Sequence, residues 1–391
     1  MIKRISICAA LIVILLGFVE LTARVILKLN KDNKQQLINW ESFHKPTENI
    51  ANLDMYKRYN WINDFQNDKP LESNSSDMCT GLKYEPFYLW KSSPCMTKYR
   101  TTDADGNRTT KYNVTTCDNK TTIYVFGSST MAGDGILRDV DLIPSIIAKN
   151  LNEKYSSNQC FEVKNFAQSG FNQGNEYVLF MDILSKGEIP DYVIFYDGAT
   201  DILQNVLYGE PHMGFEMFNL ISTWWSSGDY NRFVTYLALK KSAFFRLLNK
   251  EYTLKKYYIH DKDTINKRCA TLANTYAGRA DVINKLSKQY NFKFTLALQP
   301  LLFTVSNLSS EDAMLLNKIE KEFPYMIDTY NTCYKAVRDR LNEKNDYFFD
   351  LSNFDVHNES VYFDFAHVSP LGNEMFAKAL IDEIQKKLEV K

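Results

Sequence analysis

Short apolar runs alternate with longer helix-forming stretches throughout the chain after residue 120. The runs occupy residues 123–126, 161–163, 192–196, 294–298 and 347–349, and helical patterns occur at residues 143–155, 173–186 and 370–388. Short, continuous apolar runs are typical of parallel strands that are buried on both faces. Strands separated by helices also favour a parallel sheet. The pattern therefore predicts an α/β fold in which helices cover both faces of a parallel sheet.

Glycine and polar residues follow three of these runs directly. They occupy residues 127–130, 166–172 and 196–201. In open parallel sheets, ligands bind beyond the carboxyl ends of the strands. We therefore expect these three turns to meet at one edge of the sheet and to form a site there.

The turn after the first run reads Gly-Ser-Ser-Thr, with Ser129 as its third residue. A hydroxyl in such a turn projects from the sheet edge, beside backbone N–H groups that can bind an oxyanion. Serine is a weak nucleophile unless a base takes its proton. A helix-capping serine is the structural alternative. The catalytic interpretation thus requires a histidine from elsewhere in the chain.

Asp364 and His367 lie three residues apart, just before the last predicted helix. At that spacing the carboxylate can orient the imidazole and stabilise its protonated form. The chain contains five histidines, and the other four have no comparable setting. Ser369 and Pro370 fit the N-cap and the first turn of the helix. We expect His367 to act as the base for Ser129.

The two other glycine turns offer donors for an oxyanion. Residues 166–172 read Phe-Ala-Gln-Ser-Gly-Phe-Asn, and residues 196–201 read Tyr-Asp-Gly-Ala-Thr-Asp. Each turn can bring a backbone N–H or a side-chain donor to a tetrahedral intermediate. The alternative for each is an ordinary turn between a strand and a helix.

The three turns and the segment from Asp364 to Gly372 make four motifs. Their residues and their order along the chain resemble those of the SGNH/GDSL hydrolase superfamily, and the resemblance covers residues 121–388. It implies a flavodoxin-like three-layer α/β/α sandwich and a serine acyl-ester mechanism that needs no metal or other cofactor. It also implies that Ser129 is the nucleophile and that His367 and Asp364 complete a catalytic triad. Gly170 is then the residue whose backbone N–H binds the oxyanion.

One position departs from the family pattern. The third motif of the family usually reads Gly-x-Asn-Asp, and its Asn amide donates to the oxyanion, whereas this chain has Thr200 there. A threonine hydroxyl can donate, but its reach is shorter and its rotamers differ. Loss of one oxyanion donor can cost about 100- to 1000-fold in rate. Either Thr200 or a neighbouring group substitutes for the amide, or the activity is reduced.

The N-terminus carries two basic residues followed by an apolar run that reaches residue 27, interrupted by Glu20 and Arg24. About 20 apolar residues suffice to cross a membrane, and charges one helical turn apart can pair. We predict a transmembrane signal anchor at residues 5–28, with residues 1–4 as a short cytoplasmic tail. This anchor also resembles those of membrane-tethered family members. A cleaved signal peptide is the alternative.

Seven cysteines occur, of which one lies in the apolar N-terminal run. The other six permit three disulfides in a translocated domain. By proximity in the sequence, we predict the pairs Cys79–Cys95, Cys117–Cys160 and Cys269–Cys333. Buried free thiols are the alternative.

Two regions do not follow the alternating pattern of strands and helices. Residues 29–120 are polar with weak periodicity, and we interpret them as a stalk and an irregular segment that packs on the hydrolase domain at residues 121–391. Residues 203–262 are helical and aromatic, and they form an insertion in that domain. The insertion is either a lid or substrate-binding cap, or a set of extra helices on the sheet.

The charge is balanced, with 46 basic and 47 acidic residues, which argues against a nucleic-acid surface. The sequence therefore predicts an extracytoplasmic esterase, anchored to a membrane, that acts on a small-molecule or glycan ester such as a carbohydrate O-acetyl group. Two alternatives stay open: a polysaccharide O-acetyltransferase of the same fold, and a catalytically silent binding protein. The complete triad favours an enzyme, while Thr200 favours the silent protein.

Overall fold

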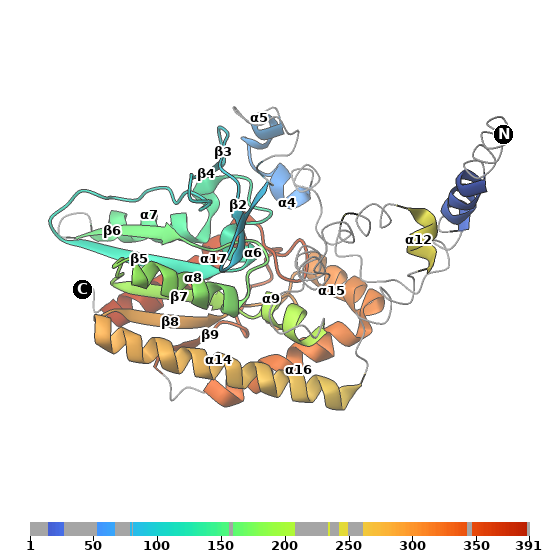
Figure 1. Ribbon diagram of the computed structural model, residues 1–391. Helices are drawn as coiled ribbons and strands as arrows, with labels where there is room; N and C mark the ends of the chain where they lie inside the picture. The colour runs from blue at the N-terminus through green and yellow to red at the C-terminus, as the bar shows by residue number, and fades with distance from the viewer. Residues whose placement is uncertain are drawn as a thin grey trace, which may run out of the picture.

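A parallel sheet forms the centre of the molecule (Figure 1). The computed structural model describes residues 15–26, 53–66, 79, 81–155, 159–207, 234, 242–248, 261–341 and 346–388. In sheet order, the strands are Cys160–Asn165 (β6), Lys120–Gly127 (β5), Tyr192–Asp197 (β7), Lys293–Leu298 (β8) and Phe348–Asp350 (β9). All neighbouring pairs are parallel. This is the strand order of flavodoxin-like sheets, and it confirms the predicted parallel sheet.

The predicted apolar runs correspond to the five strands, with small differences in their bounds. The last strand begins at Phe348, one residue later than predicted, and β5 begins at Lys120, one residue earlier than the predicted domain boundary. Every residue of β7 is buried, because the strand lies inside the sheet and helices cover both its faces. Burial on both faces is the reason that these runs are continuous rather than alternating.

Helices cover the sheet on its two faces. One face carries α7 (Ile143–Tyr155) and α17 (Pro370–Leu388), which pack together. The other face carries α8 (Gln173–Ser185) and α14 (Lys262–Tyr290), and α16 (Pro324–Leu341) packs along α14 (Figure 1). Shorter elements are α6 (Ser129–Ala132), η1 (Asp139–Asp141), α9 (Ala199–Ile202) and α15 (Ser310–Glu322). Because crossovers between parallel strands are right-handed as a rule, connections that run in both directions along the sheet place helices on both faces.

The segment before β5 contains short helices and strands within its described residues. It contains α4 (Asp54–Lys57), α5 (Ile62–Gln66), the antiparallel hairpin β1 (Leu82–Glu85) and β2 (Leu89–Ser92), and the short antiparallel pair β3 (Cys95–Met96) and β4 (Thr101–Thr102). Strands this short carry too few residues to show a period in the sequence. Contacts with the sheet domain hold them instead.

Arg108 makes three of the contacts between this segment and the sheet domain. Its buried guanidinium donates to the Asp139 carboxylate at 2.9 Å and to the backbone carbonyls of Gly133 and Ile136. A planar guanidinium with several fixed donors suits such a site, because each donor finds a buried acceptor. Arg108 therefore fastens the N-terminal segment to the loop that follows α6.

The three predicted disulfides are confirmed. Cys79 is bonded to Cys95, Cys117 to Cys160, and Cys269 to Cys333. The first encloses the β1–β2 hairpin, and the last joins α14 to α16. The alternative of buried free thiols does not apply to these cysteines.

The N-terminal helix is described for residues 15–26 only. Glu20 and Arg24 form the predicted ion pair at 3.1 Å, and Glu20 also accepts hydrogen bonds from Ser242 and from the first N–H groups of α12 (Ala243–Leu248). Within the described residues, no helix has both the length and the apolar character that crossing a membrane requires. The remainder of the predicted anchor, residues 5–14 and 27–28, lies outside the described residues. The predicted transmembrane helix is therefore not confirmed.

Most of the aromatic insertion also lies outside the described residues. Of residues 203–262, the structure describes residues 203–207, which continue the helical path of α9, residue 234, α12 and the start of α14. The choice between a lid and extra helices stays open.

Candidate active site

Ser129 lies at the carboxyl end of β5, where the chain turns into α6. Gly127 ends the strand, and a Cβ atom on it would lie 2.7 Å from the Cβ of Met131. The tight turn therefore depends on glycine. Ser128 occupies the N-cap with an extended backbone, and Ser129 is the first helical residue. Ser129 is thus not the helix cap, and its partly exposed side chain stands at the sheet edge.

His367 reaches Ser129 from the loop before α17. Its Nε2 lies 2.8 Å from Ser129 Oγ, and its Nδ1 lies 2.6 Å from Asp364 Oδ2. The other carboxylate oxygen of Asp364 accepts the backbone N–H groups of Ala366 and His367. The predicted spacing of three residues therefore builds a turn that fixes the carboxylate against the ring. The structure thus joins three of the predicted site residues in one hydrogen-bonded chain.

The electrostatics of the pair suit a base. Burial by itself lowers the pKa of His367, but the negative charge of Asp364 and its hydrogen bond outweigh burial and raise that pKa above its ordinary value. Burial likewise favours protonation of Asp364, yet the charge of His367 and the hydrogen bonds to the carboxylate hold the pKa of Asp364 below its usual range. At neutral pH the carboxylate is ionised, so it accepts the Nδ1 proton and leaves Nε2 to accept from the serine.

Gln299 connects the turn that carries Ser129 to the loop that carries His367. The sequence did not point to this residue. Its buried amide donates to Thr130 Oγ1 at 2.8 Å and to the carbonyl of Ala366 at 3.3 Å. Thr130 follows the serine, and Ala366 precedes the histidine. Gln299 comes directly after β8, at the same sheet edge as the glycine turns. Its position after a predicted strand was the signal available in the sequence.

Asp134 and Phe363 also border the site and were not predicted. The backbone N–H of Asp134 donates to the Ser129 carbonyl at 2.8 Å, and its carboxylate accepts the Ser169 hydroxyl at 2.7 Å. The ring of Phe363 stacks on the imidazole of His367, with centroids 5.8 Å apart. Neither residue belongs to a motif, so only their positions in space connect them to the site.

Gly170 lies in the turn after β6 with a φ of +81°, a backbone conformation that glycine adopts readily. Its carbonyl accepts a hydrogen bond from Gln204 at 2.8 Å. Its N–H finds no acceptor among the described residues. The N–H is thus available to a ligand, and its role at an oxyanion stays a prediction.

In the part of the chain that the structure describes, the hydroxyl of Thr200 bonds to Ser128 and forms no hydrogen bond with Ser129. The Oγ1 of Thr200 lies 2.5 Å from the hydroxyl of Ser128, and both side chains are buried. The hydroxyl pair joins the turn after β7 to the turn after β5. Thr200 therefore bonds to the residue that precedes Ser129, and its role at an oxyanion stays a prediction.

Among the described residues, no group of three or more His, Cys, Asp or Glu side chains is placed to hold a metal ion. The hydrogen-bonded chain of Ser129, His367 and Asp364 can move a proton from a hydroxyl to an imidazole, which is the first requirement of nucleophilic catalysis by serine.

No family model and no curated protein matches the sequence. The solved structures that the chain resembles include an acetyl xylan esterase, at 14% identity over 68% of this chain and 98% of the other, with a TM-score of 0.33. They also include a lipolytic protein of the G-D-S-L family from Desulfitobacterium hafniense (12% identity, 67% and 99% covered, TM-score 0.35) and a lipase/acylhydrolase from Enterococcus faecalis (12%, 68% and 96%, 0.35).

Proposed function

We propose that this chain is a serine esterase of the SGNH/GDSL type, with Ser129 as its nucleophile. The proposal depends on one observation, the continuous hydrogen-bonded chain from Asp364 through His367 to Ser129. The residues come from turns at the same edge of a parallel sheet, where α/β folds bind ligands. A silent binding protein has no need of an imidazole held between a carboxylate and a hydroxyl.

In the proposed mechanism, His367 takes the proton of Ser129 as Oγ bonds to the ester carbonyl carbon. The tetrahedral oxyanion is bound by the N–H groups of Ser129 and Gly170, with help from the hydroxyl of Thr200. The bond to the leaving alcohol then breaks, and His367 gives it the proton. Water attacks the acyl-enzyme in the same way, which releases the acid and restores the serine.

The proposed substrate class is acyl esters of small molecules or glycans, such as carbohydrate O-acetyl groups. We further propose that residues 121–391 form the catalytic domain, that this domain is extracytoplasmic, and that residues 5–28 anchor it to a membrane. The three disulfides support an oxidising compartment, because such bonds are rare in the cytosol of most organisms.

The first prediction tests the nucleophile. We expect the full chain to hydrolyse a chromogenic acetyl ester, and the Ser129→Ala variant to lose at least about 1000-fold in kcat/KM, because the acyl-enzyme no longer forms. The matched control is Ser185→Ala, which removes an exposed hydroxyl at the end of α8. Equal rates for wild type and Ser129→Ala would eliminate the proposal. Acetyl transfer to a glycan that outpaces hydrolysis would indicate the acetyltransferase instead.

A further inference from the structure

The turn that carries Gly170 has two possible peptide orientations. Residues 168–171 form a β-turn in which the N–H of Phe171 donates to the carbonyl of Gln168 at 3.1 Å. With a φ of +81°, Gly170 occupies the third position in the manner of a type II turn. Type I and type II turns differ in the orientation of the central peptide. Here that peptide joins Ser169 to Gly170, and it carries the N–H that the proposed mechanism uses.

Glycine alone does not choose between these orientations. Turning the central peptide over changes the sign of φ at Gly170, and glycine populates both signs about equally. In the other orientation the Ser169 carbonyl would replace the Gly170 N–H, and an acceptor would face the side that the donor faces now. The partial negative charge of that carbonyl oxygen would repel an oxyanion, whereas the N–H binds it. A contact from outside the turn is therefore needed to select the donor orientation.

Trp90 makes that contact from strand β2. Its indole Nε1 donates to the Ser169 carbonyl oxygen at 2.9 Å. The ring is 4% exposed and packs edge-on against Phe171, with centroids 5.5 Å apart. In a trans peptide the C=O and the N–H point in opposite directions, and the chain has no cis peptide among its described residues. Since the indole holds the carbonyl on one side, the N–H of Gly170 faces the other.

The remaining contacts of the turn fix its neighbours rather than this peptide. Gln204 binds the carbonyl of Gly170, which belongs to the next peptide, and Asn172 holds the amide of Gln204 at 2.6 Å. The Ser169 hydroxyl binds Asp134, but a side-chain bond leaves the peptide free to turn. In the described part of the chain, only the indole of Trp90 bonds to the central peptide itself.

We propose that Trp90 is a positioning residue that keeps the Ser169–Gly170 peptide in its donor orientation. The N-terminal segment is then part of the catalytic unit as well as a connection to the N-terminal helix. The inference depends on the proposed function for its effect on catalysis, while the peptide orientation can be observed independently of activity.

Two substitutions remove the indole donor. Trp90→Phe keeps an aromatic ring beside Phe171, and replacement of Trp90 by benzothienylalanine keeps the bicyclic shape and removes only the N–H. We expect each to lower kcat by about 10- to 100-fold, because one oxyanion donor is lost for part of the time. The KM should stay within about threefold, because ground-state contacts are unchanged. The matched control is Tyr88→Phe in the same hairpin, which should keep the wild-type kcat.

A double-mutant cycle tests whether Trp90 acts through this peptide. Gly170→Ala disfavours the positive φ and favours the turned peptide by itself. In the Trp90→Phe background the further loss in kcat should be smaller than in the wild type, because both changes act on one equilibrium. Independent losses that multiply would overturn the proposal.

Crystal structures of the two Trp90 variants test whether the indole sets the orientation of the Ser169–Gly170 peptide. We expect the Ser169–Gly170 peptide to be turned over, or present in both orientations. A peptide that keeps its present orientation in both variants would overturn the proposal, whatever the kinetics show. If the wild type has no hydrolysis that depends on Ser129, the proposed function fails, and the crystal structures still decide the role of Trp90.

Discussion

Thr200 and Ser128 form a buried pair of hydroxyls next to the proposed nucleophile. One of the two hydroxyls donates its proton to the other. The hydroxyl that accepts keeps its own proton, which it can donate to a third group. If Ser128 donates to Thr200, the proton of Thr200 can point at the oxyanion. The pair can thus supply the donor that an asparagine amide supplies in the family pattern.

Substitution of Thr200 tests this assignment. Thr200→Val keeps the shape of the side chain and removes the hydroxyl, so we expect kcat to fall by about 10- to 100-fold with little change in KM. Thr200→Ser keeps the hydroxyl and should stay within about threefold of the wild type. Kinetics of the two purified variants with the same acetyl ester provide the comparison. Equal kcat values for the valine and serine variants would exclude a donor role for this hydroxyl.

At the scale of elements, the β1–β2 hairpin connects the N-terminal segment to the site. Trp90 binds the Ser169 carbonyl, and Ser92 binds the side chain of Gln168 through its N–H and hydroxyl. The disulfide between Cys79 and Cys95 closes a loop around this hairpin. A two-stranded hairpin is marginally stable by itself, so the crosslink and the contacts with the turn support each other.

Removal of that disulfide should therefore affect both stability and catalysis. We expect Cys79→Ala/Cys95→Ala to lose about 2–4 kcal/mol of unfolding free energy, and to lower kcat because Trp90 is held less firmly. The control, Cys269→Ala/Cys333→Ala, removes the crosslink between α14 and α16 and should lower stability with kcat unchanged. Thermal unfolding and acetyl-ester kinetics measure the two effects. Unchanged kcat in the first variant would show that the hairpin needs no crosslink.

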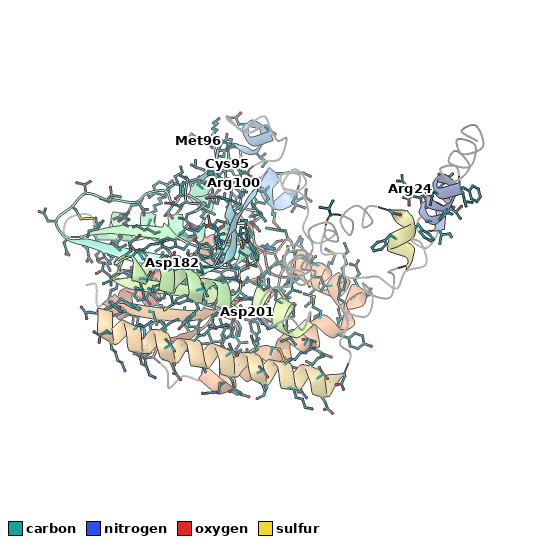
Figure 2. The ribbon with its side chains drawn as sticks, viewed as in Figure 1. Arg24, Cys95, Met96, Arg100, Asp182 and Asp201 are labelled. Carbon is teal, nitrogen blue, oxygen red and sulfur yellow. A yellow bond between two sulfur atoms is a disulfide. The ribbon has the colours of Figure 1, made fainter. Side chains whose placement is uncertain are left out.

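At the scale of the whole molecule, buried acids from three separate elements interact with one another. Glu176 of α8, Asp197 of β7 and Asp201 of α9 are all buried, and Figure 2 labels Asp201. Burial, followed by the charge of neighbouring carboxylates, raises the pKa of Glu176 and Asp197 well above the ordinary range. Burial also raises the pKa of Asp201. These carboxyls therefore remain protonated in the folded protein at pH values where the unfolded chain has released its protons.

This difference predicts how stability depends on pH. Because the folded protein holds more protons, these groups stabilise it most below about pH 4, and their contribution is lost as the pH rises towards the folded pKa values. Glu176→Gln removes one such group, so its Tm should fall less than that of the wild type between about pH 5 and about pH 8. The control is Glu359→Gln at an exposed position. Parallel Tm curves for wild type and Glu176→Gln would contradict the prediction.

The sequence by itself determined the features that depend on short stretches of backbone. Continuous apolar runs indicated the parallel strands, because strands covered on both faces have no polar positions. The spacing between Asp364 and His367 predicted their pairing, because a turn of that length brings the two side chains together. The six cysteines outside the N-terminal run also proved to be bonded in consecutive pairs along the sequence.

Only the tertiary structure decided which distant groups meet. Trp90 and Ser169 lie 79 residues apart, and Ser128 and Thr200 lie 72 residues apart, so no local pattern connects them. The same holds for Gln299, which joins the serine turn to the histidine loop. Such contacts depend on how whole elements pack. A sequence motif predicts only the local structure of its own few residues. The strands of the N-terminal segment escaped prediction for the same reason, because the sheet domain supplies the contacts that order them.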